Sequence, residues 1–522
     1  MTLEGIITGL SRAQGFERAL DYDNRDADFS LVDGLRAPLL ASLLTAQARP
    51  RALLAITATG RESESLHNSL QCFLPEARIV EFPAWETLPH ERLSPSAETV
   101  GRRISALREM RAWSDNPVGQ FVLVASVRAA VQPLADNLTS IEPISLAAGG
   151  RGYDLAGLTR QLVDLAYSRV DMVTRRGEFA VRGGILDVFA PTDEHPVRLE
   201  FFGDELEHVR EFSVADQRSL PTEITAAQFP ASRELLLSTA VRQRAREMQH
   251  EFPSLKTMLA KIGEGIPVDG MESLAPALLE RLVPVTHYLP TDAAIAVLSP
   301  ERVSARAASL VETNREFLAA AWNAATAGAE TPIDLEAGEF LTLSALRAAA
   351  GDRPWWTLSG FDSGLGGFDP PSAAQPADDD SEYIRIDARS VPSFAGQPDG
   401  ALGHVSELLS DGWRVAIVAQ GPGLVDRARD VLAEHELAGR EVQAFPSDAE
   451  PGVAYLLQAS IDVGFELPEI KLAVLSEAEF FGRTAGYDSR QVKRLASRRR
   501  NVVDPLQLKS GDFVVHQTHG IG

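Results

Sequence analysis

The clearest candidate for a binding surface is a pair of arginines and a phenylalanine between residues 182 and 202. Residues 196–203 alternate apolar and polar side chains, which predicts a strand with one buried face. Arg198 and Phe202 then share the outer face, and Arg182 precedes a Gly-Gly bend that places it close by in a hairpin-like arrangement. An exposed aromatic ring beside an arginine is typical of the residues that dominate protein interfaces.

A second interpretation of the same residues is purely structural. Phe202 would pack under a neighbouring loop, and the arginines would pair with nearby carboxylates. The carboxylates considered for that pairing are Glu200, Asp204 and Glu205. The residues alone leave both interpretations open, because isolated apolar side chains are normal on protein surfaces.

The chain lacks the sequence motifs that bind and hydrolyse nucleotides. A phosphate-binding loop of the form G-x-x-x-x-G-K-[ST] uses backbone amides, a lysine and a hydroxyl. Behind the first predicted strand, at 29–32, residues 33–38 hold one glycine and neither lysine nor hydroxyl, and the chain contains no Gly-Lys pair. At 421–423 a Gly-Pro-Gly turn precedes a predicted helix, but Asp426 replaces the third glycine of a dinucleotide fingerprint. We therefore expect no catalytic residues, no bound cofactor and no enzymatic activity in this chain.

The sequence also lacks a convincing set of metal ligands. His516 and His519 could supply two ligands, but Asp512 is the nearest carboxylate and no cysteine lies nearby. Cys72 is the single cysteine, which excludes an intrachain disulfide and any zinc site with two thiolates. We expect no metal site and assign Cys72 to packing.

Basic residues gather near the end of the chain. Besides Arg490 and Lys493, the cluster contains Arg494, Arg498, Arg499 and Arg500. These last four are candidates for a contact with nucleic acid or with an acidic partner, and a solvated helix end is the alternative. The whole chain carries a net charge of −23, the opposite of the basic surface of a dedicated nucleic-acid binder.

Short apolar runs and amphipathic helical patterns alternate from residue 29 onward, which predicts βα units and a parallel sheet. Strands are expected at 29–32, 52–56, 79–82, 121–125, 293–298, 414–419 and 471–475. Helices are expected at 37–47, around 66–73, around 104–110, around 155–165, from 300 to about 327, and at 424–434. The fold class is therefore a multidomain α/β protein.

A change of pattern near residue 134, where strands follow one another without helices, predicts an inserted α+β domain at 134–222. The surrounding α/β domain would comprise 1–133 and 223–370. An acidic, proline-rich linker is expected at 371–382, a separate α/β domain at 383–485, a basic linker at 486–505 and the first strand of a small β domain at 506–522.

The composition is that of an ordinary globular protein, with 44% hydrophobic and 24% charged residues. No run approaches the roughly 20 apolar residues of a membrane span, and the first residues lack a basic segment before an apolar one. We expect a cytoplasmic protein without a membrane partner.

Several collinear stretches resemble the bacterial transcription-repair coupling factors. Three lie in the inserted domain: YSRVDMV at 167–173, GEFAVRGGILDVF at 177–189, and residues 196–205. The others are WETLP at 85–89 with Ser94-Pro95, LSEAEFFGR at 475–483, and LKSGDFVVHQTHGIG at 508–522. The resemblance covers nearly the whole chain.

This resemblance implies a module similar to the excision-repair protein UvrB. The large domain would be a degenerate helicase-like (RecA-like) domain, split by an insertion that binds UvrA. The UvrA contacts would fall on Arg182, Arg198 and Phe202, the three side chains that the alternation pattern indicates. Residues 506–522 would open the domain that binds the RNA polymerase β subunit.

The resemblance also implies that the chain is an N-terminal portion of a longer protein. An ATP- and magnesium-dependent DNA translocase motor would lie beyond residue 522 and would make most of the DNA contacts. The expected function is recruitment of UvrA to RNA polymerase stalled at DNA damage, for transcription-coupled nucleotide excision repair. The alternatives are a nucleotide-dependent helicase in its own right and a module that binds only the polymerase.

Overall fold

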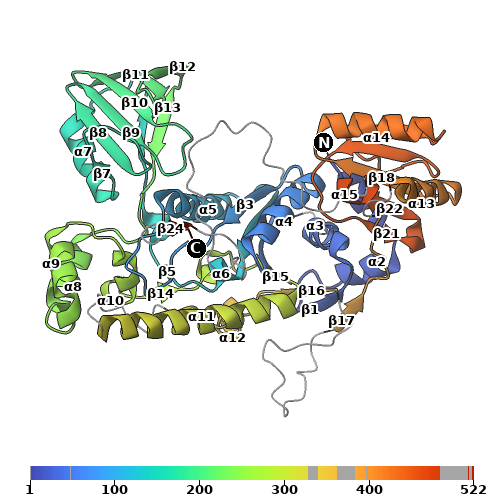
Figure 1. Cartoon of the computed structure of the whole chain (residues 1–522), viewed down its shortest axis with the longest axis horizontal. Helices are drawn as coiled ribbons and strands as arrows, with labels where there is room; N and C mark the ends of the chain where they lie inside the picture. Colours follow the sequence, from blue (N-terminus) through green and yellow to red (C-terminus); the bar gives the residue numbers. More distant parts are fainter. Residues whose placement is uncertain are drawn as a thin grey trace, which may run out of the picture. The chain divides into compact units, whose positions relative to one another are not determined.

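The computed structural model describes residues 2–46, 49–326, 339–360, 382–394, 398–481, 515–516 and 520–521. The chain divides into two compact units, Met1–Thr484 and Ala485–Gly522, which are described separately. The first unit contains three main β-sheets and their helices (Figure 1).

A seven-stranded, wholly parallel sheet forms the largest layer. Its strands, in spatial order, are β17 (Glu382–Arg385), β1 (Ala27–Ser30), β16 (Trp355–Ser359), β15 (Ala294–Leu298), β2 (Arg51–Thr57), β4 (Gln120–Ser126) and β3 (Arg78–Phe82). Every residue of β2 is buried, as a parallel strand covered on both faces requires. The strands expected near 29–32, 52–56, 79–82, 121–125 and 293–298 are confirmed to within two residues.

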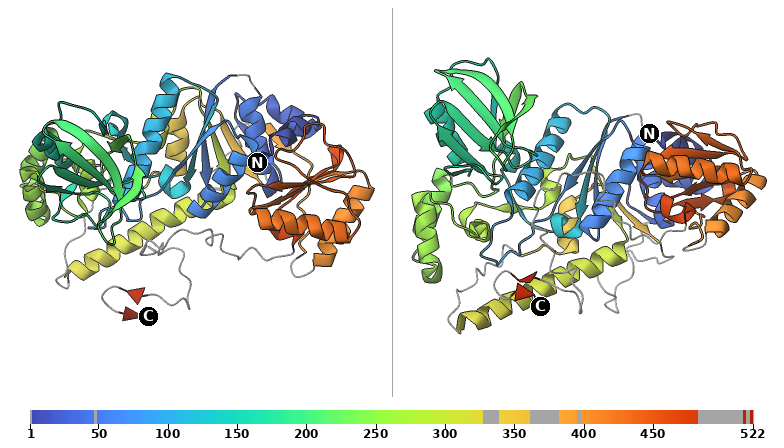
Figure 2. Two further views of the ribbon diagram at one scale, coloured as in Figure 1. Left: turned by 90° about the horizontal axis from the view of Figure 1, so that it is seen from above. Right: turned by 45° about the horizontal axis from the view of Figure 1, so that its top comes forward.

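Helices lie on both sides of this sheet (Figure 2). The helices are α1 (Glu4–Leu10), α2 (Gln14–Leu20), α3 (Arg36–Thr45), α4 (Gly60–Phe73), α5 (Ala97–Asp115), α6 (Val127–Ala130), α11 (Pro300–Thr326) and α12 (Leu343–Ala350). Helices α1–α4 share one hydrophobic cluster with alternate residues of β2, including Leu53 and Ala55, whereas α5 contacts β3 and β4. A capping box fixes the start of α4, because Thr59 accepts from the Glu62 amide at 3.3 Å and Glu62 accepts from the Thr59 amide at 3.2 Å.

A six-stranded sheet is formed by residues that lie between β4 and β15 in the chain. Its strands, in spatial order, are β12 (Ser219–Glu223), β11 (Glu205–Phe212), β10 (Val197–Phe202), β9 (Ile185–Phe189), β8 (Glu178–Arg182) and β7 (Ser168–Arg169). Pairing is antiparallel except between β7 and β8. Helix α7 (Leu155–Asp164) buries Leu158 and Leu162 against the inner face of this sheet, in a cluster that includes Leu199.

Smaller elements accompany the six-stranded sheet. Two short antiparallel pairs are β6 (Ile144–Ala147) with β13 (Ala226–Phe229) and β5 (Leu134–Ala135) with β14 (Leu282–Val283). Helices α8 (Thr239–Met248), α9 (Lys256–Glu264) and α10 (Ala275–Leu278) follow. Turns of 3-10 helix are η1 (Asp33–Leu35), η2 (Leu138–Ser140), η3 (Pro253–Leu255), η4 (Met271–Leu274), η5 (Val285–Tyr288) and η7 (Pro468–Ile470).

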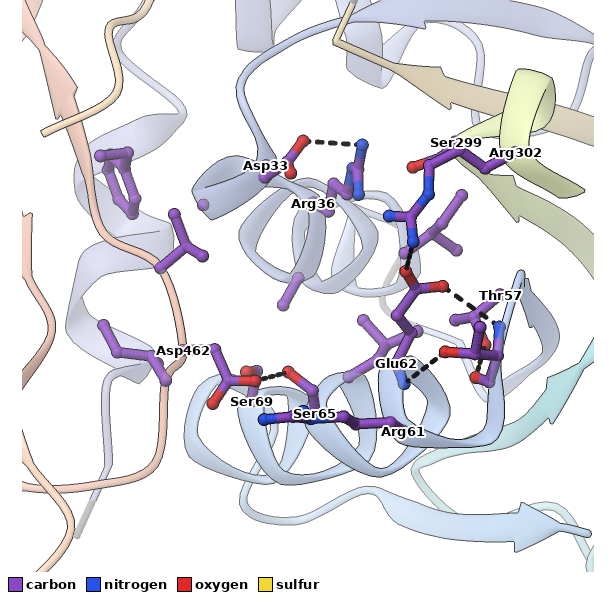
Figure 3. A pocket seen from close by; sticks show the side chains of 18 of the residues that line it. Asp33, Arg36, Thr57, Arg61, Glu62, Ser65, Ser69, Ser299, Arg302 and Asp462 are labelled. Atoms are coloured by element: carbon purple, nitrogen blue, oxygen red, sulfur yellow. Dashed lines mark hydrogen bonds and ion pairs between the residues drawn. The ribbon is translucent and has the colours of Figure 1, made fainter. Parts of the chain in front are cut away.

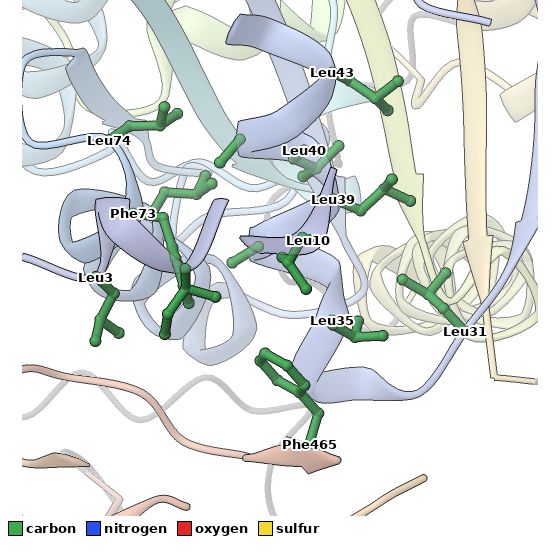
Figure 4. Packing of buried hydrophobic residues seen from close by; sticks show 14 of the residues in the cluster. Leu3, Leu10, Leu31, Leu35, Leu39, Leu40, Leu43, Phe73, Leu74 and Phe465 are labelled. Atoms are coloured by element: carbon green, nitrogen blue, oxygen red, sulfur yellow. The ribbon is translucent and has the colours of Figure 1, made fainter. Parts of the chain in front are cut away.

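A five-stranded sheet forms the second α/β element. Its order is β19 (Gly439–Glu441), β20 (Ala454–Gln458), β18 (Arg414–Ala419), β22 (Leu472–Leu475) and β21 (Phe465–Leu467), with α13 (Pro398–Ser410), α14 (Pro422–Glu434) and α15 (Glu477–Phe480). The strands expected at 414–419 and 471–475 and the helix expected at 424–434 are confirmed. The hydrophobic cluster beneath α1–α4 continues into this sheet through Phe465 of β21, which packs near Leu35 and Leu10 (Figure 4).

Residues 382–385 lie at the start of the segment expected to be a separate domain. In the structure they form β17, which hydrogen bonds with β1 at the edge of the large parallel sheet. The described part of the second unit is one antiparallel pair, β23 (Val515–His516) with β24 (Gly520–Ile521). Arg494, Arg498, Arg499 and Arg500 lie outside the described residues. Among the described helices, none combines the length and the apolar character that crossing a membrane requires.

Candidate protein-binding site on the six-stranded sheet

Cross-strand register brings the predicted site residues onto one face of the six-stranded sheet. Arg198 in β10 lies opposite Asp187 in β9, and Arg182 at the end of β8 lies opposite Ile185. A two-residue turn joins β8 to β9, and Gly183 adopts a φ of +61° there, a conformation that favours glycine. The predicted alternation in β10 is confirmed, since Leu199 is fully buried whereas Phe202 is 75% exposed.

Asp187 connects the two arginines. Its carboxylate accepts hydrogen bonds from Nε and Nη2 of Arg198 at 2.7 and 2.9 Å, and from Nη2 of Arg182 at 3.3 Å. Asp187 is only 1% exposed. A buried carboxylate is stable only with such partners, and the paired bonds to Arg198 fix the orientation of both side chains.

Arg198 is restrained by three hydrogen bonds and by one aromatic ring. Besides the bonds to Asp187, its Nη1 donates to the Gln217 carbonyl oxygen at 3.2 Å, and its guanidinium carbon lies 4.7 Å from the centroid of the Phe212 ring. The hydrogen bonds to Asp187 raise the pKa of Arg198 above its ordinary value. The side chain is 16% exposed, so Arg198 presents little of its surface to a partner.

The local contacts agree in part with each of the two interpretations. Phe202 does not pack under a loop, and half of the Arg182 side chain is exposed. The arginines pair with Asp187 rather than with Glu200, Asp204 or Glu205, so the carboxylates suggested by sequence proximity are wrong. The cause is the antiparallel register, which brings Asp187 opposite Arg198 although eleven positions separate them in the chain.

A second set of charged side chains continues across the same face. Arg210 of β11 lies opposite Arg198 and pairs with Glu223 at 2.8 Å and with Glu200 at 3.7 Å. The hydrogen bonds and charge of Arg210 lower the pKa of Glu223. Exposed pairs of this kind add little stability, but they set the charge pattern of the outer face beside Arg198.

Two residues of this face were not identified from the sequence. Asp187 is a single carboxylate in the otherwise apolar strand β9, and such a residue opposite an arginine is a recognisable signal once the hairpin register is known. Ile185 is 36% exposed and lies opposite both Arg182 and Glu200. We call Arg182, Ile185 and Phe202 the outer patch.

A separate cavity of about 410 Å³ lies at the carboxyl ends of β1, β2 and β15, where open α/β sheets commonly bind ligands (Figure 3). Its lining includes residues of η1 and of the first turn of α3, the position at which a phosphate-binding loop would follow β1. Three arginines line the cavity: Arg36 pairs with Asp33 at 2.7 Å, Arg302 pairs with Glu62 at 2.5 Å, and Arg61 of α4 is the third. Two of the three cations are therefore offset by carboxylates of the same cavity, whereas a phosphate site turns its cations toward the ligand.

Residues 461–465 close one side of this cavity. Ser65 of α4 donates a hydrogen bond to Asp462. Gly34 lies so close to the Gly464 carbonyl oxygen that a Cβ at position 34 would clash with it. The loop before β21 therefore packs directly on η1, at the position where a phosphate-binding loop would have to contact a nucleotide.

The six-stranded sheet lies in a segment that is similar to a known domain family. Residues 144–233 match the family model of the UvrB interaction domain. This range contains all of the six-stranded sheet, including Arg182, Asp187, Arg198 and Phe202.

The relatives of the whole chain are transcription-repair-coupling factors. That of Mycobacterium bovis is 42% identical over 514 residues, which cover 94% of this chain and 40% of the relative. Those of Myxococcus xanthus and Bacillus subtilis are 29% and 24% identical, covering 94% and 100% of this chain and 42% and 44% of the relatives. The resemblance indicated by the motifs is thus confirmed along nearly the whole chain, which spans about two fifths of the length of these relatives.

Proposed function

We propose that this chain recruits UvrA to RNA polymerase stalled at DNA damage, in transcription-coupled nucleotide excision repair. The observation that supports this most directly is the outer patch, where an arginine and a phenylalanine are exposed on one face of the six-stranded sheet. The patch lies inside the segment that matches the UvrB interaction domain. A protein that resembles UvrB over this segment would use it to contact the same partner as UvrB, namely UvrA.

The remaining domains fit the same proposal. The seven-stranded parallel sheet would be the degenerate helicase-like domain, with the UvrA-binding domain inserted between β4 and β15. The paired arginines of the cavity and the lack of any Gly-Lys pair favour a role without nucleotide hydrolysis in this chain. ATP- and magnesium-driven translocation on DNA, and displacement of polymerase, would belong to other parts of the full-length coupling factor.

Two further contacts are part of the proposal. Residues 506–522 would begin the domain that contacts the polymerase β subunit. The basic cluster at Arg494, Arg498, Arg499 and Arg500 would contact DNA or polymerase through its charge, and raising the salt concentration would weaken such a contact. The cytoplasm, where transcription-coupled repair takes place in bacteria, would be the site of action.

A pull-down with UvrA tests the docking proposal. Immobilised chain should capture UvrA, and Arg182→Ala and Phe202→Ala should each weaken binding by about 2 kcal/mol or more, because both would be anchors that lose water on binding. Arg198→Ala should also weaken binding, but it leaves Asp187 with fewer partners and needs a check of folding.

Val163→Ala provides a matched control. Val163 is 51% exposed on α7, the helix that packs on the inner face of the same sheet. This variant should capture UvrA like the parent chain. Equal capture by the parent, Arg182→Ala and Phe202→Ala would exclude the outer patch as the docking site.

A further inference from the structure

We propose that buried Asp187 is a positioning residue for the outer patch, and that the partner supplies a carboxylate for Arg182 and an apolar pocket for Phe202 and Ile185. This inference rests on the proposed function, because UvrA is the partner in question. It goes beyond that function by assigning contact with the partner to the outer patch and assigning the orientation of the arginines to Asp187.

The separation follows from the contacts of the two arginines. Arg198 uses Nε and Nη2 on Asp187 and Nη1 on Gln217, and its flat face covers the Phe212 ring. Each of its three nitrogens therefore donates a hydrogen bond inside the domain. Arg182 uses one terminal nitrogen on Asp187, at 3.3 Å, and keeps half of its side chain exposed. Arg182 is thus the arginine that can bond to a partner.

Asp187 has the geometry of a support. It is fixed in the middle of β9, between Ala180 of β8 and Arg198 of β10, and is 1% exposed. Its Oδ2 accepts from both arginines, so the position of Arg182 depends on the Arg198 pair. A side chain restrained in this way loses less conformational freedom when a partner binds, which favours affinity.

The chemistry of the partner follows from the exposed atoms. Arg182 offers planar N–H donors, which match a carboxylate in a two-pronged arrangement. Phe202 is 75% exposed and Ile185 36% exposed, and both lie on the same face as Arg182, around the turn at Gly183. Apolar side chains next to such a cation need a partner surface with an apolar pocket beside an acidic group.

Asp187→Asn tests the positioning role, because it preserves the shape and removes the charge. The full-length chain labelled with 15N-arginine should show a slowly exchanging Arg198 Nε–H signal, identified by its loss in Arg198→Lys. The signal should disappear or exchange rapidly in Asp187→Asn, and UvrA binding should weaken about tenfold. An unchanged Arg198 signal, or unchanged UvrA binding, would overturn the proposal.

Arg182→Ala tests the contact without removing the Asp187–Arg198 pair. It should weaken UvrA binding and also reduce the dependence of affinity on salt, since the charged contact is gone. Ile185→Ala should weaken binding without changing the salt dependence. Arg160→Ala is the charge control, because Arg160 on α7 is 71% exposed and lies away from the outer face.

The outcomes also separate this inference from the proposed function. If the parent chain does not bind UvrA, the proposed function and the partner chemistry fail, whereas the Arg198 signal still decides whether Asp187 restrains the arginines. If the parent binds UvrA but Arg182→Ala binds equally well with the same salt dependence, the proposed function stands and the inference is wrong.

Discussion

Two aspartates in and beside the six-stranded sheet differ in how their charge is compensated. Asp187 is buried and fully paired, so its charge organises the arginines around it. Asp193, in the loop between β9 and β10, is partly buried without a comparable partner. Burial, with a smaller contribution from the charge of Glu211, raises the pKa of Asp193 to about 6, and Arg176 offsets part of this effect.

Asp193→Asn should therefore stabilise the protein near neutral pH. The folded state binds a proton more tightly than the unfolded state, where aspartate has a pKa of about 3.9. The unfolding free energy of the parent should fall as pH rises from about 4 to about 6. Asp193→Asn should raise it at pH 7 by about 1 kcal/mol, less than the shift implies because the side chain is partly exposed.

Urea unfolding of the parent and of Asp193→Asn, measured near pH 4 and near pH 7, checks this prediction. The difference between the two proteins should be large near pH 7 and small near pH 4. A difference that does not depend on pH would mean that Asp193 does not titrate in this range.

The sequence predicts the direction of a side chain correctly where a local pattern determines it. The period of two in β10 is enough to turn Arg198 and Phe202 outward, because side chains alternate along any strand. The carboxylate that pairs with the arginines could not be predicted from a local pattern. Asp187 becomes a neighbour of Arg198 only through the register of β9 and β10, and a one-residue shift would move it to the other face.

At the scale of elements, the loop at 461–465 is the feature that most shapes the large sheet's cavity. Its Gly464 carbonyl lies against Gly34, and the preceding Ser460 amide donates to the Cys72 sulfur of α4 at 3.3 Å. Burial raises the pKa of the Cys72 thiol. The loop and the first helices thus pack as one body, in the hydrophobic cluster that also contains Phe465.

Gly34→Ala should displace this loop, because the new Cβ has no room beside the Gly464 carbonyl oxygen. Overpacking of this kind costs about 1–3 kcal/mol, which should increase local opening by about fivefold to about a hundredfold. Cys72 is the single cysteine and is 8% exposed, so its reaction with a thiol reagent reports that opening without interference. The reaction should be correspondingly faster in the variant.

Gly423→Ala is the control for this experiment. A Cβ at Gly423, near the start of α14, would have nothing within 4 Å, so the substitution should leave the Cys72 reaction unchanged. If Gly34→Ala and the parent react at the same rate, the loop is not held where the structure places it.

Elements differ in how far the sequence determines them. Strands β2, β4 and β15 follow from near-continuous apolar runs, since a strand covered on both faces has few alternatives. Strand β17 was not predicted, because residues 382–385 are a short polar and apolar mixture at a sheet edge. Only pairing with β1, more than 350 positions away, makes them a strand. In the same way, β13 (Ala226–Phe229) pairs with β6 although it lies beyond residue 222, where the inserted domain was expected to end.

At the scale of the whole molecule, charge and architecture point to protein contacts. A net charge of −23 disfavours a general affinity for nucleic acid. Several described arginines, including Arg36, Arg198 and Arg302, form ion pairs within the protein. The outer patch is where an exposed cation and exposed apolar side chains coincide. The proposal of UvrA as its partner rests on the match to the UvrB interaction domain rather than on geometry, because an outward face shows what it can bind but not which protein presents the complement.

Site-specific photo-crosslinking from the outer patch tests the central claim most directly. A benzoylphenylalanine placed at position 202 in the full-length chain should crosslink to UvrA on irradiation, and the same group at position 163 on α7 should not. Crosslinking to UvrA from position 202 alone is the result that the docking account predicts. No crosslink from position 202, or equal crosslinking from both positions, would contradict it.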